Sequence, residues 1–247
     1  ILARDFGFND FRFDIMGHSP KASILAAREV VRSFDPNVYF YGEGWNFGEV
    51  TNNRLFVQAK QIDMAGTEVG TFNDRPRDPI REAVLFSADA SDDTLRKQDL
   101  IRIGLAGTLK DYVLENYQGV AGPASSFGGA GYAADPADII NYVSKHDNET
   151  LWDKLQYGLT ASMTLAERVR AQNVAIAIPL MSQGIPFLQM GGDFLRSKSM
   201  DRDSYDSGDW FNFVDFNMQS NNFAVGLPLA DKNRDNWPRI GELLTNP

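Results

Sequence analysis

Three short segments place an acidic side chain where an apolar, strand-like run gives way to a loop containing glycine or asparagine. The acids are Asp14, Glu43 and Asp147, in segments 11–14, 41–45 and 143–148. A pair of carboxyl groups can cleave a glycosidic bond, because one attacks the anomeric carbon while the other protonates the leaving oxygen. The pattern therefore indicates carboxylate chemistry on a sugar, with the acids presented at strand ends as in a barrel.

Asp14 and Glu43 form the natural catalytic pair. Arg12 precedes Asp14 by two residues, so both side chains lie on one face of an extended strand and the guanidinium can hold the carboxylate ionised, which suits a nucleophile. Glu43 lies between two glycines and near Trp45, where a wall of low polarity would favour the protonated form that a proton donor needs. Trp45 could also stack on a sugar ring.

A third acid would complete such a site. Asp147, preceded by His146, can bond sugar hydroxyls more tightly in the oxocarbenium-like transition state than in the ground state. This chemistry requires no metal or other cofactor. Asp- and Asn-rich loops offer oxygen ligands for structural calcium, but no regularly spaced calcium loop is present, so no metal ligands are assigned.

The elements that must carry these acids alternate between strand and helix patterns, which indicates parallel βαβ construction. A chain of 247 residues with 43% hydrophobic residues can bury a substantial core, which predicts a globular domain. We expect a long polar insertion over 45–95 and a mobile glycine-rich loop over 119–131. The expected strands are 11–15, 38–41, 112–114, 139–143 and 185–189, and the expected helices are 20–33, 95–109 and 165–181.

Charge and composition limit the classes of molecule that the chain could bind. The net charge of −9 opposes binding to nucleic acid or anionic lipid, whereas a neutral carbohydrate fits. The absence of cysteine excludes disulfides and thiolate metal sites. No apolar run approaches the ~20 residues that span a bilayer, so we expect no membrane insertion. Oligomeric state and compartment stay open.

The start of the chain bears on its completeness. Residue 1 is Ile and the first strand-like run begins at Phe11, so the chain looks truncated at its front. Five strand-like units are present where eight would close a (β/α)8 barrel, so about three are missing. We therefore expect residues 1–247 to form one partial catalytic barrel domain.

Several motifs resemble a known family. FRFDIMG at 11–17, YGEGW at 41–45 and YVSKHDN at 142–148 resemble motifs of the type I pullulanases and limit dextrinases, debranching enzymes of the α-amylase superfamily (glycoside hydrolase family 13). GTFNDR at 70–75 and the runs 195–199 and 203–212 favour the debranching subgroup over ordinary α-amylases. The resemblance covers nearly the whole chain, from about barrel strand 4 through strand 8.

The resemblance implies roles for individual residues. By this likeness Asp14 is the nucleophile, Glu43 the general acid/base and Asp147 the transition-state stabiliser. Substrate-binding positions implied in the same way are Arg12, Trp45 and His146, with Arg75 and Asp203 as weaker correspondences.

Departures from the family pattern limit the resemblance. Asn9-Asp10 stands where Asp-Gly is usual, Asn46 where Asp is common, and Pro76 and Pro79 interrupt the segment after Asp74. The strand-three motif of the superfamily is absent, so an isolated chain of this extent risks being unfolded or inactive.

Each feature also has a structural alternative. Arg12 with Asp14 could be an ordinary ion pair at a strand end, and Glu43 a turn residue. Trp45 could belong to the core, and His146 could be structural, as we expect for His18. The joint occurrence of three acids, in order and in matching contexts, favours a glycosidase site.

The function predicted is hydrolysis of α-1,6-glucosidic bonds in pullulan, amylopectin and limit dextrins by a retaining double displacement. The partner is then an α-glucan. Two alternatives remain: a non-catalytic α-glucan-binding or structural barrel fragment, and an α-1,4-acting amylase relative or branching enzyme.

Overall fold

A computed structural model describes residues 1–245 and divides the chain into two compact units. The first, here called the sheet unit, comprises Ile1–Arg75, Arg102–Asn141 and Ser182–Pro186. The second, the helical unit, comprises Pro76–Ile101, Tyr142–Met181 and the described residues from Phe187 onward. Each unit has its own buried apolar cluster, so each is described separately below.

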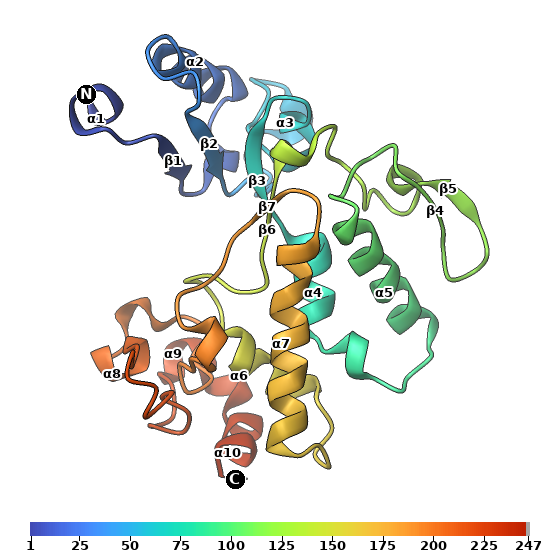
Figure 1. The fold of residues 1–247 in the computed structure, drawn as a ribbon, viewed down its shortest axis with the longest axis vertical. Coiled ribbons are helices and arrows are strands. Elements are labelled where there is room, and N and C mark those ends of the chain that lie inside the picture. The colour runs from blue at the N-terminus through green and yellow to red at the C-terminus, as the bar shows by residue number, and fades with distance from the viewer. Residues whose placement is uncertain (246–247) are drawn as a thin grey trace. The chain divides into compact units, whose positions relative to one another are not determined.

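The sheet unit is built on five parallel strands in the order β1-β2-β3-β6-β7 (Figure 1). Neighbours in the sheet follow chain order, as expected for part of an α/β barrel. This confirms the predicted fold in its general form. The strands are β1 Asp10–Phe13, β2 Tyr39–Gly42, β3 Val69–Asn73, β6 Ile139–Asn141 and β7 Ile185–Pro186.

Helix α2, Lys21–Arg32, confirms the predicted helix over 20–33. Pro20 stands at its N-cap in an extended conformation, immediately before the first helical residue. Ile24 is buried in the cluster that also holds Phe40 of β2 and Val69 of β3, with Phe11 of β1 packed against it. The helix thus covers the first three strands with its apolar stripe, and it connects β1 to β2 as a βαβ crossover.

The third strand was not predicted, because segment 45–95 appeared to be a polar insertion. That segment contains β3, which is buried at all five positions, and the helices α3, Gln61–Met64, and α4, Asp74–Arg81. The polar side chains of β3 are bonded inside the fold: Thr71 Oγ1 lies 3.0 Å from Tyr132 Oη, and Asn73 Nδ2 donates to Asn141 Oδ1 at 2.9 Å. Polar residues with such partners can be buried, so polarity alone was misleading.

The predicted strand over 112–114 exists but belongs elsewhere. It corresponds to β4, Val113–Glu115, which pairs antiparallel with β5, Ala121–Pro123, in a separate two-stranded sheet. The glycine-rich segment 119–131 therefore contains a strand. The count of five strands was right for the parallel sheet, but its membership was wrong, because β3 takes the place given to 112–114.

Strand ends also differ from the prediction. β1 ends at Phe13, and its four residues alternate between exposed and half-buried, whereas a buried strand was expected over 11–15. β6 ends at Asn141 and β7 at Pro186, earlier than expected. The apolar runs continue past the hydrogen-bonded ladder, so hydrophobicity overestimates strand length.

The helical unit packs helices around a second apolar cluster. Leu151 and Leu155 of α6 (Leu151–Gly158), Ala171 and Ala175 of α7 (Leu165–Met181), and Ile80 of α4 are buried together there. The helix predicted over 165–181 is confirmed, and that over 95–109 lies at α5, which runs from the helical unit into the sheet unit. The remaining helices are α1 Leu2–Phe6, α5 Asp92–Leu105, α6 Leu151–Gly158, α7 Leu165–Met181, α8 Asp209–Asn212, α9 Ala230–Asn233 and α10 Trp237–Thr245. Short 3₁₀ turns occupy Met16–His18, Thr51–Asn53, Val84–Phe86, Ala124–Ser126, Pro136–Asp138, Gly192–Phe194, Ser204–Asp206 and Arg234–Asn236.

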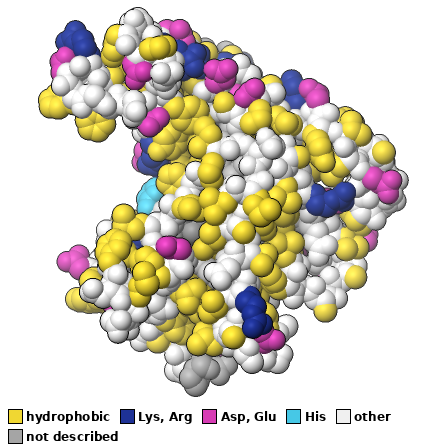
Figure 2. Space-filling model, viewed as in Figure 1, with side chains coloured by type: hydrophobic (Ala, Val, Ile, Leu, Met, Phe, Trp, Pro, Cys, Tyr) yellow, Lys and Arg dark blue, Asp and Glu magenta, His cyan; other side chains and the backbone are white. Residues whose placement is uncertain are grey.

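The surface mixes acidic and basic side chains with exposed apolar ones (Figure 2). Large exposed hydrophobic side chains are frequent at Ile1, Leu2, Phe6 and Phe8 and again over 205–229. Clusters of this kind are typical of surfaces that contact a ligand or another protein segment. Among residues 1–245, none of the helices has the length and apolar character needed to cross a membrane.

One close approach in the sheet unit requires glycine. A Cβ on Gly17 would lie 2.0 Å from the carbonyl oxygen of Trp45, which is backbone and cannot rotate away, whereas a Cβ on Gly241 in α10 would meet open space. We expect Gly17→Ala to destabilise the fold by about 3 kcal/mol or more. Gly241→Ala, the matched control, should stabilise α10 by about 0.5–1 kcal/mol. Urea unfolding measures both changes in stability, and equal changes would show that the close approach of Gly17 to Trp45 does not require glycine.

Candidate functional site

The centre of the site in the sheet unit is one guanidinium between two carboxylates. Arg12 Nη2 lies 3.1 Å from Asp14 Oδ1 and 3.1 Å from Glu43 Oε1. The carboxylate oxygens of Asp14 and Glu43 approach within 4.8 Å of each other. The side chain of Asp14 is 69% exposed and that of Glu43 only 5%, so the two acids experience different environments. An accessible carboxylate and a buried one therefore meet at the ends of β1 and β2.

The backbone of Glu43 is fixed on both sides. Its N–H donates to the carbonyl oxygen of Phe13 at 3.2 Å, and its carbonyl oxygen accepts from the Gly17 N–H at 2.8 Å. The flanking glycines permit these approaches, since a Cβ on Gly42 would lie 2.5 Å from Phe13 O and one on Gly44 2.8 Å from Thr71 Cγ2. Glu43 therefore directly follows a strand and is held there by close backbone packing, rather than being a free turn residue.

Ile15 positions the carboxylate of Glu43 through its main chain. Its N–H donates to Glu43 Oε2 at 3.0 Å, and its φ of 39° lies in the left-handed region, which is rare for a β-branched residue. A strained residue of this kind persists only when its surroundings hold it, and such residues cluster at functional sites. The strain at Ile15 directs a backbone donor at the buried acid.

Trp45 and Arg75 also lie in the sheet unit. Trp45 is half-buried, at the point where its carbonyl oxygen contacts Gly17. Arg75 donates to Gln61 Oε1 at 2.7 Å, pairs with the neighbouring Asp74, and places its guanidinium 5.0 Å from the ring centroid of Tyr132. Arg75 is thus held by protein groups, and its predicted substrate contact stays a prediction.

The acid in the helical unit lies on the loop that follows β6. Asp147 pairs with the buried Lys145 through Oδ2, and His146 Nε2 lies 3.3 Å from Asp147 Oδ1. The side chain of Asp147 is 46% exposed and that of His146 61%. The neighbouring Asn148 adopts a left-handed conformation with φ of 61°. The carboxylate is therefore accessible to solvent and already paired with a cation.

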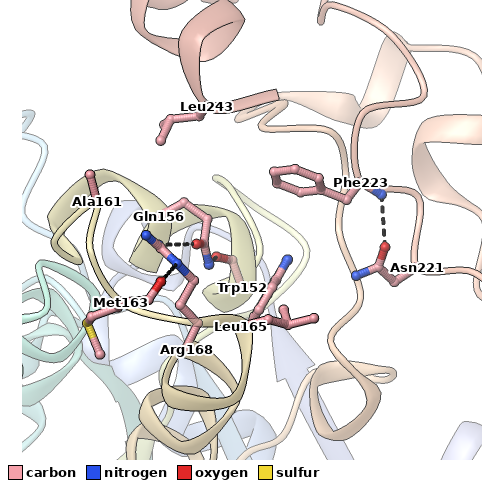
Figure 3. Close-up of a pocket in the computed structure, with 9 residues that line it drawn as sticks. All are labelled: Trp152, Gln156, Ala161, Met163, Leu165, Arg168, Asn221, Phe223 and Leu243. Atoms are coloured by element: carbon pink, nitrogen blue, oxygen red, sulfur yellow. Dashed lines mark hydrogen bonds between the residues drawn. The ribbon is translucent and has the colours of Figure 1, made fainter. Parts of the chain in front are cut away.

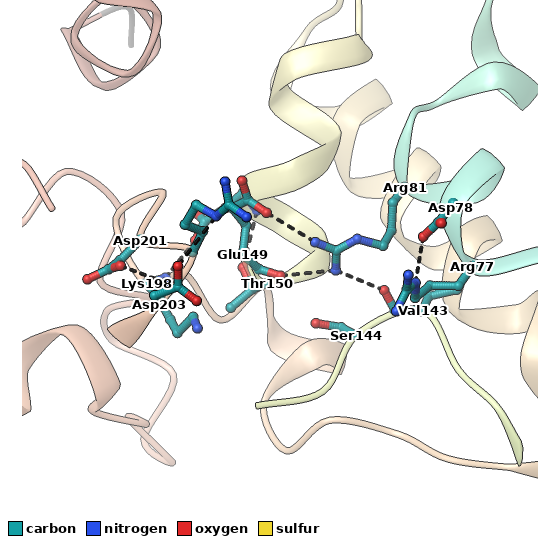
Figure 4. A network of polar contacts seen from close by, with 12 residues as sticks. Arg77, Asp78, Arg81, Val143, Ser144, Glu149, Thr150, Lys198, Asp201 and Asp203 are labelled. Carbon is teal, nitrogen blue, oxygen red and sulfur yellow. Dashed lines mark hydrogen bonds and ion pairs between the residues drawn. The ribbon is translucent and has the colours of Figure 1, made fainter. Parts of the chain in front are cut away.

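A polar network surrounds this loop (Figure 4). Arg81 points toward Val143 and Glu149: its Nη1 donates to both carbonyl oxygens, at 3.1 Å and 3.0 Å, and its Nη2 pairs with the Glu149 carboxylate at 3.3 Å. On the other side, Lys198 Nζ donates to the His146 carbonyl oxygen at 3.2 Å. Burial lowers the pKa of both Arg81 and Lys198, and Glu149 opposes the shift at Arg81.

Asp203, the remaining predicted binding residue, also lies in the helical unit. Its carboxylate is 3.5 Å from Arg202 Nε, and its N–H donates to Asp201 Oδ1 at 2.9 Å. Asp201 is fully buried and also accepts from Ser207 Oγ and Asn233 Nδ2. These bonds give Asp203 a place in a structured loop. Its substrate contact stays a prediction.

Sequence reasoning missed Asp153, a fully buried carboxylate on α6. It accepts from Ser197 Oγ and from the Lys198 N–H at 2.7 Å, and burial raises its pKa despite these bonds. The run 195–199 was singled out as a family motif, and its serine and lysine turn out to bind this acid. An Asp inside an amphipathic helix gives little signal in sequence, because that position is usually solvent-facing.

A cavity of about 310 Å³ in the helical unit is lined by none of the predicted site residues (Figure 3). Its lining includes Trp152, Gln156 and Phe223 around Arg168. Arg168 donates to Gln156 Oε1 at 2.7 Å, to Thr160 O at 2.8 Å and to Met163 O at 3.2 Å. These bonds serve the surrounding loop, so the cavity offers no chemistry comparable to the paired acids.

The chain is similar over its whole length to known proteins. It is 43% identical to the pullulanase of Klebsiella pneumoniae over 277 residues, covering 100% of the chain and 25% of that protein, and 40% identical to the chloroplastic pullulanase 1 of Arabidopsis thaliana, covering 98% and 29%. The chain thus spans about a quarter of the length of these curated relatives. No protein-family model matches it.

Solved structures of pullulanases are also similar to this chain. The ligand-free PulA of Klebsiella pneumoniae superposes with a TM-score of 0.93 at 42% identity, over 99% of this chain and 26% of that one. A maltotriose complex of PulA from the same organism gives 0.92 at 40% identity, over 99% and 29%. The pullulanase of Bacillus acidopullulyticus, at 24% identity and a TM-score of 0.69, shares the fold.

A sheet of consecutive parallel strands with acids at their carboxyl ends defines part of an α/β barrel protein. Within that class, the chain is a homologue of the pullulanases, matching about a quarter of their length. The resemblance inferred from the motifs is confirmed.

The bridge formed by Arg12 gives a test of the site in the sheet unit. Replacing Arg12 by Met removes the cation beside the buried Glu43 carboxylate, which should destabilise the fold by about 2–4 kcal/mol. The double variant Arg12→Met with Glu43→Gln should recover more than half of this loss, because a neutral amide needs no counter-charge. Arg4→Met, which removes an exposed pair with Asp5, should leave the unfolding midpoint unchanged. If the effects of Arg12→Met and Glu43→Gln on the free energy of unfolding simply add in the double variant, Arg12 and Glu43 are not coupled.

Proposed function

We propose that the chain forms part of a retaining glycoside hydrolase that cleaves α-1,6-glucosidic bonds in pullulan, amylopectin and limit dextrins. The observation that carries the proposal is the Asp14–Arg12–Glu43 bridge, in which two carboxylates lie within 4.8 Å of each other. Retaining glycosidases hold their two carboxyl groups about 5–5.5 Å apart, and inverting ones about 6.5–9.5 Å. The short separation favours retention.

Asp14 suits the first chemical step. Its exposed carboxylate can reach the anomeric carbon, and Arg12 lies beside it as an ion-pair partner. As Asp14 forms a bond to that carbon, the bond to the glycosidic oxygen breaks and Glu43 transfers its proton to the departing oxygen.

The second step reverses these roles. Glu43, now ionised, takes a proton from a water molecule, which attacks the anomeric carbon and releases Asp14 as a carboxylate. The N–H of Ile15 and the guanidinium of Arg12 stabilise the ionised form of Glu43 between the two steps. The configuration of the anomeric carbon is retained because each of the two displacements inverts it once.

The family motifs support the remaining assignments. We assign Asp147 as transition-state stabiliser, and Arg12, Trp45 and His146 as substrate-binding residues, with Arg75 and Asp203 in lesser roles. The five consecutive parallel strands support strands 4 to 8 of a (β/α)8 barrel within one catalytic domain over 1–247.

The partner proposed is an α-glucan. The maltotriose complexes of the Klebsiella pneumoniae protein support an α-glucan oligosaccharide as ligand. The acidic balance of the chain, with a net charge of −9, disfavours nucleic acid and anionic membranes. The proposed chemistry uses no metal or organic cofactor.

Removal of the nucleophile tests the mechanism. Asp14→Ala should lower kcat for pullulan by at least about 10³-fold while leaving glucan binding and the melting temperature nearly unchanged. Asp10→Ala is the matched control, because Asp10 is an exposed acid at the start of β1, four residues before Asp14. Reducing-sugar release and circular dichroism give the two readouts. Equal activity of wild type and Asp14→Ala would remove Asp14 from the mechanism.

Product analysis tests the bond specificity. Hydrolysis of α-1,6 bonds in pullulan yields maltotriose, whereas cleavage of its α-1,4 bonds yields panose or isopanose. We expect maltotriose, identified by chromatography against standards. Panose would establish the α-1,4-acting alternative, and binding of pullulan without any product would favour a non-catalytic glucan-binding role.

A further inference from the structure

We propose that Arg81 and Lys198 are positioning residues that hold loop 143–149 by its main-chain carbonyl oxygens and so fix the carboxylate of Asp147. The inference rests on the proposed role of Asp147 and extends it to two residues that contact neither the carboxylate nor a sugar. Both side chains come from elements far from the loop in sequence: Arg81 ends α4, and Lys198 lies between α7 and α8.

Arg81 donates hydrogen bonds to both ends of the loop. One nitrogen, Nη1, donates to the carbonyl oxygens of Val143 at 3.1 Å and Glu149 at 3.0 Å, which stand six residues apart (Figure 4). The residue is only 6% exposed, so these bonds form away from water. A single rigid, planar group therefore sets the distance between the start and the end of the loop.

Lys198 holds the middle of the loop. Its Nζ donates to the carbonyl oxygen of His146, the residue immediately before Asp147, at 3.2 Å, and the residue is 1% exposed. Lys198 is itself anchored, because its N–H donates to Asp153 Oδ2 at 2.7 Å and Asp153 also accepts from Ser197. Asp153, the buried acid of α6, thus fixes the main chain of Lys198, from which the side chain extends to the loop.

The loop needs such support because it has left the sheet. β6 ends at Asn141, so the carbonyl oxygens of Val143, His146 and Glu149 lie beyond the strand ladder and accept hydrogen bonds from the side chains of Arg81 and Lys198 instead. Burying two cations is unfavourable unless each forms good hydrogen bonds. A carbonyl cluster at the loop meets that requirement, so the cations and the loop conformation stabilise each other.

The consequence for Asp147 is geometric. Its side chain is half-exposed and pairs with Lys145, and the position from which the carboxylate reaches outward is set by where the main chain places its Cα. A displacement of about 1 Å of a catalytic group can lower a rate by about 10²-fold. Loss of either cation should therefore lower kcat by about 10–10²-fold and change KM by less than about threefold, since a transition-state stabiliser acts mainly on the chemical step.

A structural ion pair between Arg81 and Glu149 is the rival explanation, and a double variant separates the two. Arg81→Met leaves the Glu149 carboxylate without this cation, so it should lower both stability and kcat. Arg81→Met with Glu149→Gln removes the buried charge and should recover the melting temperature. If Arg81 positions the loop, kcat stays low in the double variant. If Arg81 only neutralises Glu149, kcat recovers together with stability, and the proposal is overturned.

Conservative and control variants sharpen the test. Arg81→Lys retains a cation but cannot form the same set of bonds, so kcat should lie between those of wild type and Arg81→Met. Lys198→Met removes the contact with His146 and should reproduce the loss of kcat. Arg168→Met is the matched control: Arg168 also holds two carbonyl oxygens, at Thr160 and Met163, but on a loop without a proposed catalytic group. It should leave kcat unchanged.

Hydrogen exchange provides a readout that does not depend on activity. Amides of 143–149 should exchange at least about tenfold faster in Lys198→Met and in the Arg81 double variant than in wild type, with the β1 to β3 amides unchanged. Unchanged exchange over 143–149 in both variants would overturn the proposal. Absence of pullulan hydrolysis by a full-length protein that contains this chain would refute the proposed function, and the exchange data would still decide whether the two cations hold the loop.

Discussion

The arrangement at the end of β1 depends on one guanidinium, that of Arg12, which contacts two acidic side chains. A buried carboxylate such as Glu43 is unfavourable unless a counter-charge and hydrogen bonds compensate it. Arg12 on β1 supplies the charge, and Ile15, two residues past the end of β1, supplies a backbone N–H, while Glu43 directly follows the neighbouring strand β2. The parallel register of β1 and β2 is therefore part of the chemistry, because it brings residues about thirty positions apart within hydrogen-bonding distance.

The helical unit solves a similar problem by different means. Its acid, Asp147, stands on a loop without strand pairing, and buried cations bind the carbonyl groups of that loop. The sheet unit uses glycines and main-chain hydrogen bonds to bring segments together, whereas the helical unit uses long basic side chains. Both solutions leave one carboxylate accessible while most of the supporting groups are buried.

The sequence allowed local features of the fold and the site to be predicted, and it concealed those made by long-range contacts. Spacing of two on a strand correctly placed Arg12 beside Asp14, and the helices α2 and α7 were predicted close to their observed bounds. β3 was missed, because Thr71 and Asn73 look like loop residues until their partners in other segments are known. The bond from Arg81 to the loop was likewise invisible, since nothing near Arg81 in sequence indicates a carbonyl acceptor more than sixty residues away.

The left-handed Ile15 has a consequence for sequence variation. The group that it offers to Glu43 is a backbone N–H, which every residue except proline carries. Its exposed side chain contributes little packing. Natural or designed variants can therefore exchange the side chain at this position freely, and asparagine or glycine would suit its φ better than isoleucine. Proline alone would lose both the donor and the backbone angle, so a key contact of the proposed acid is encoded in chain geometry, where comparison of side chains between homologues would not reveal it.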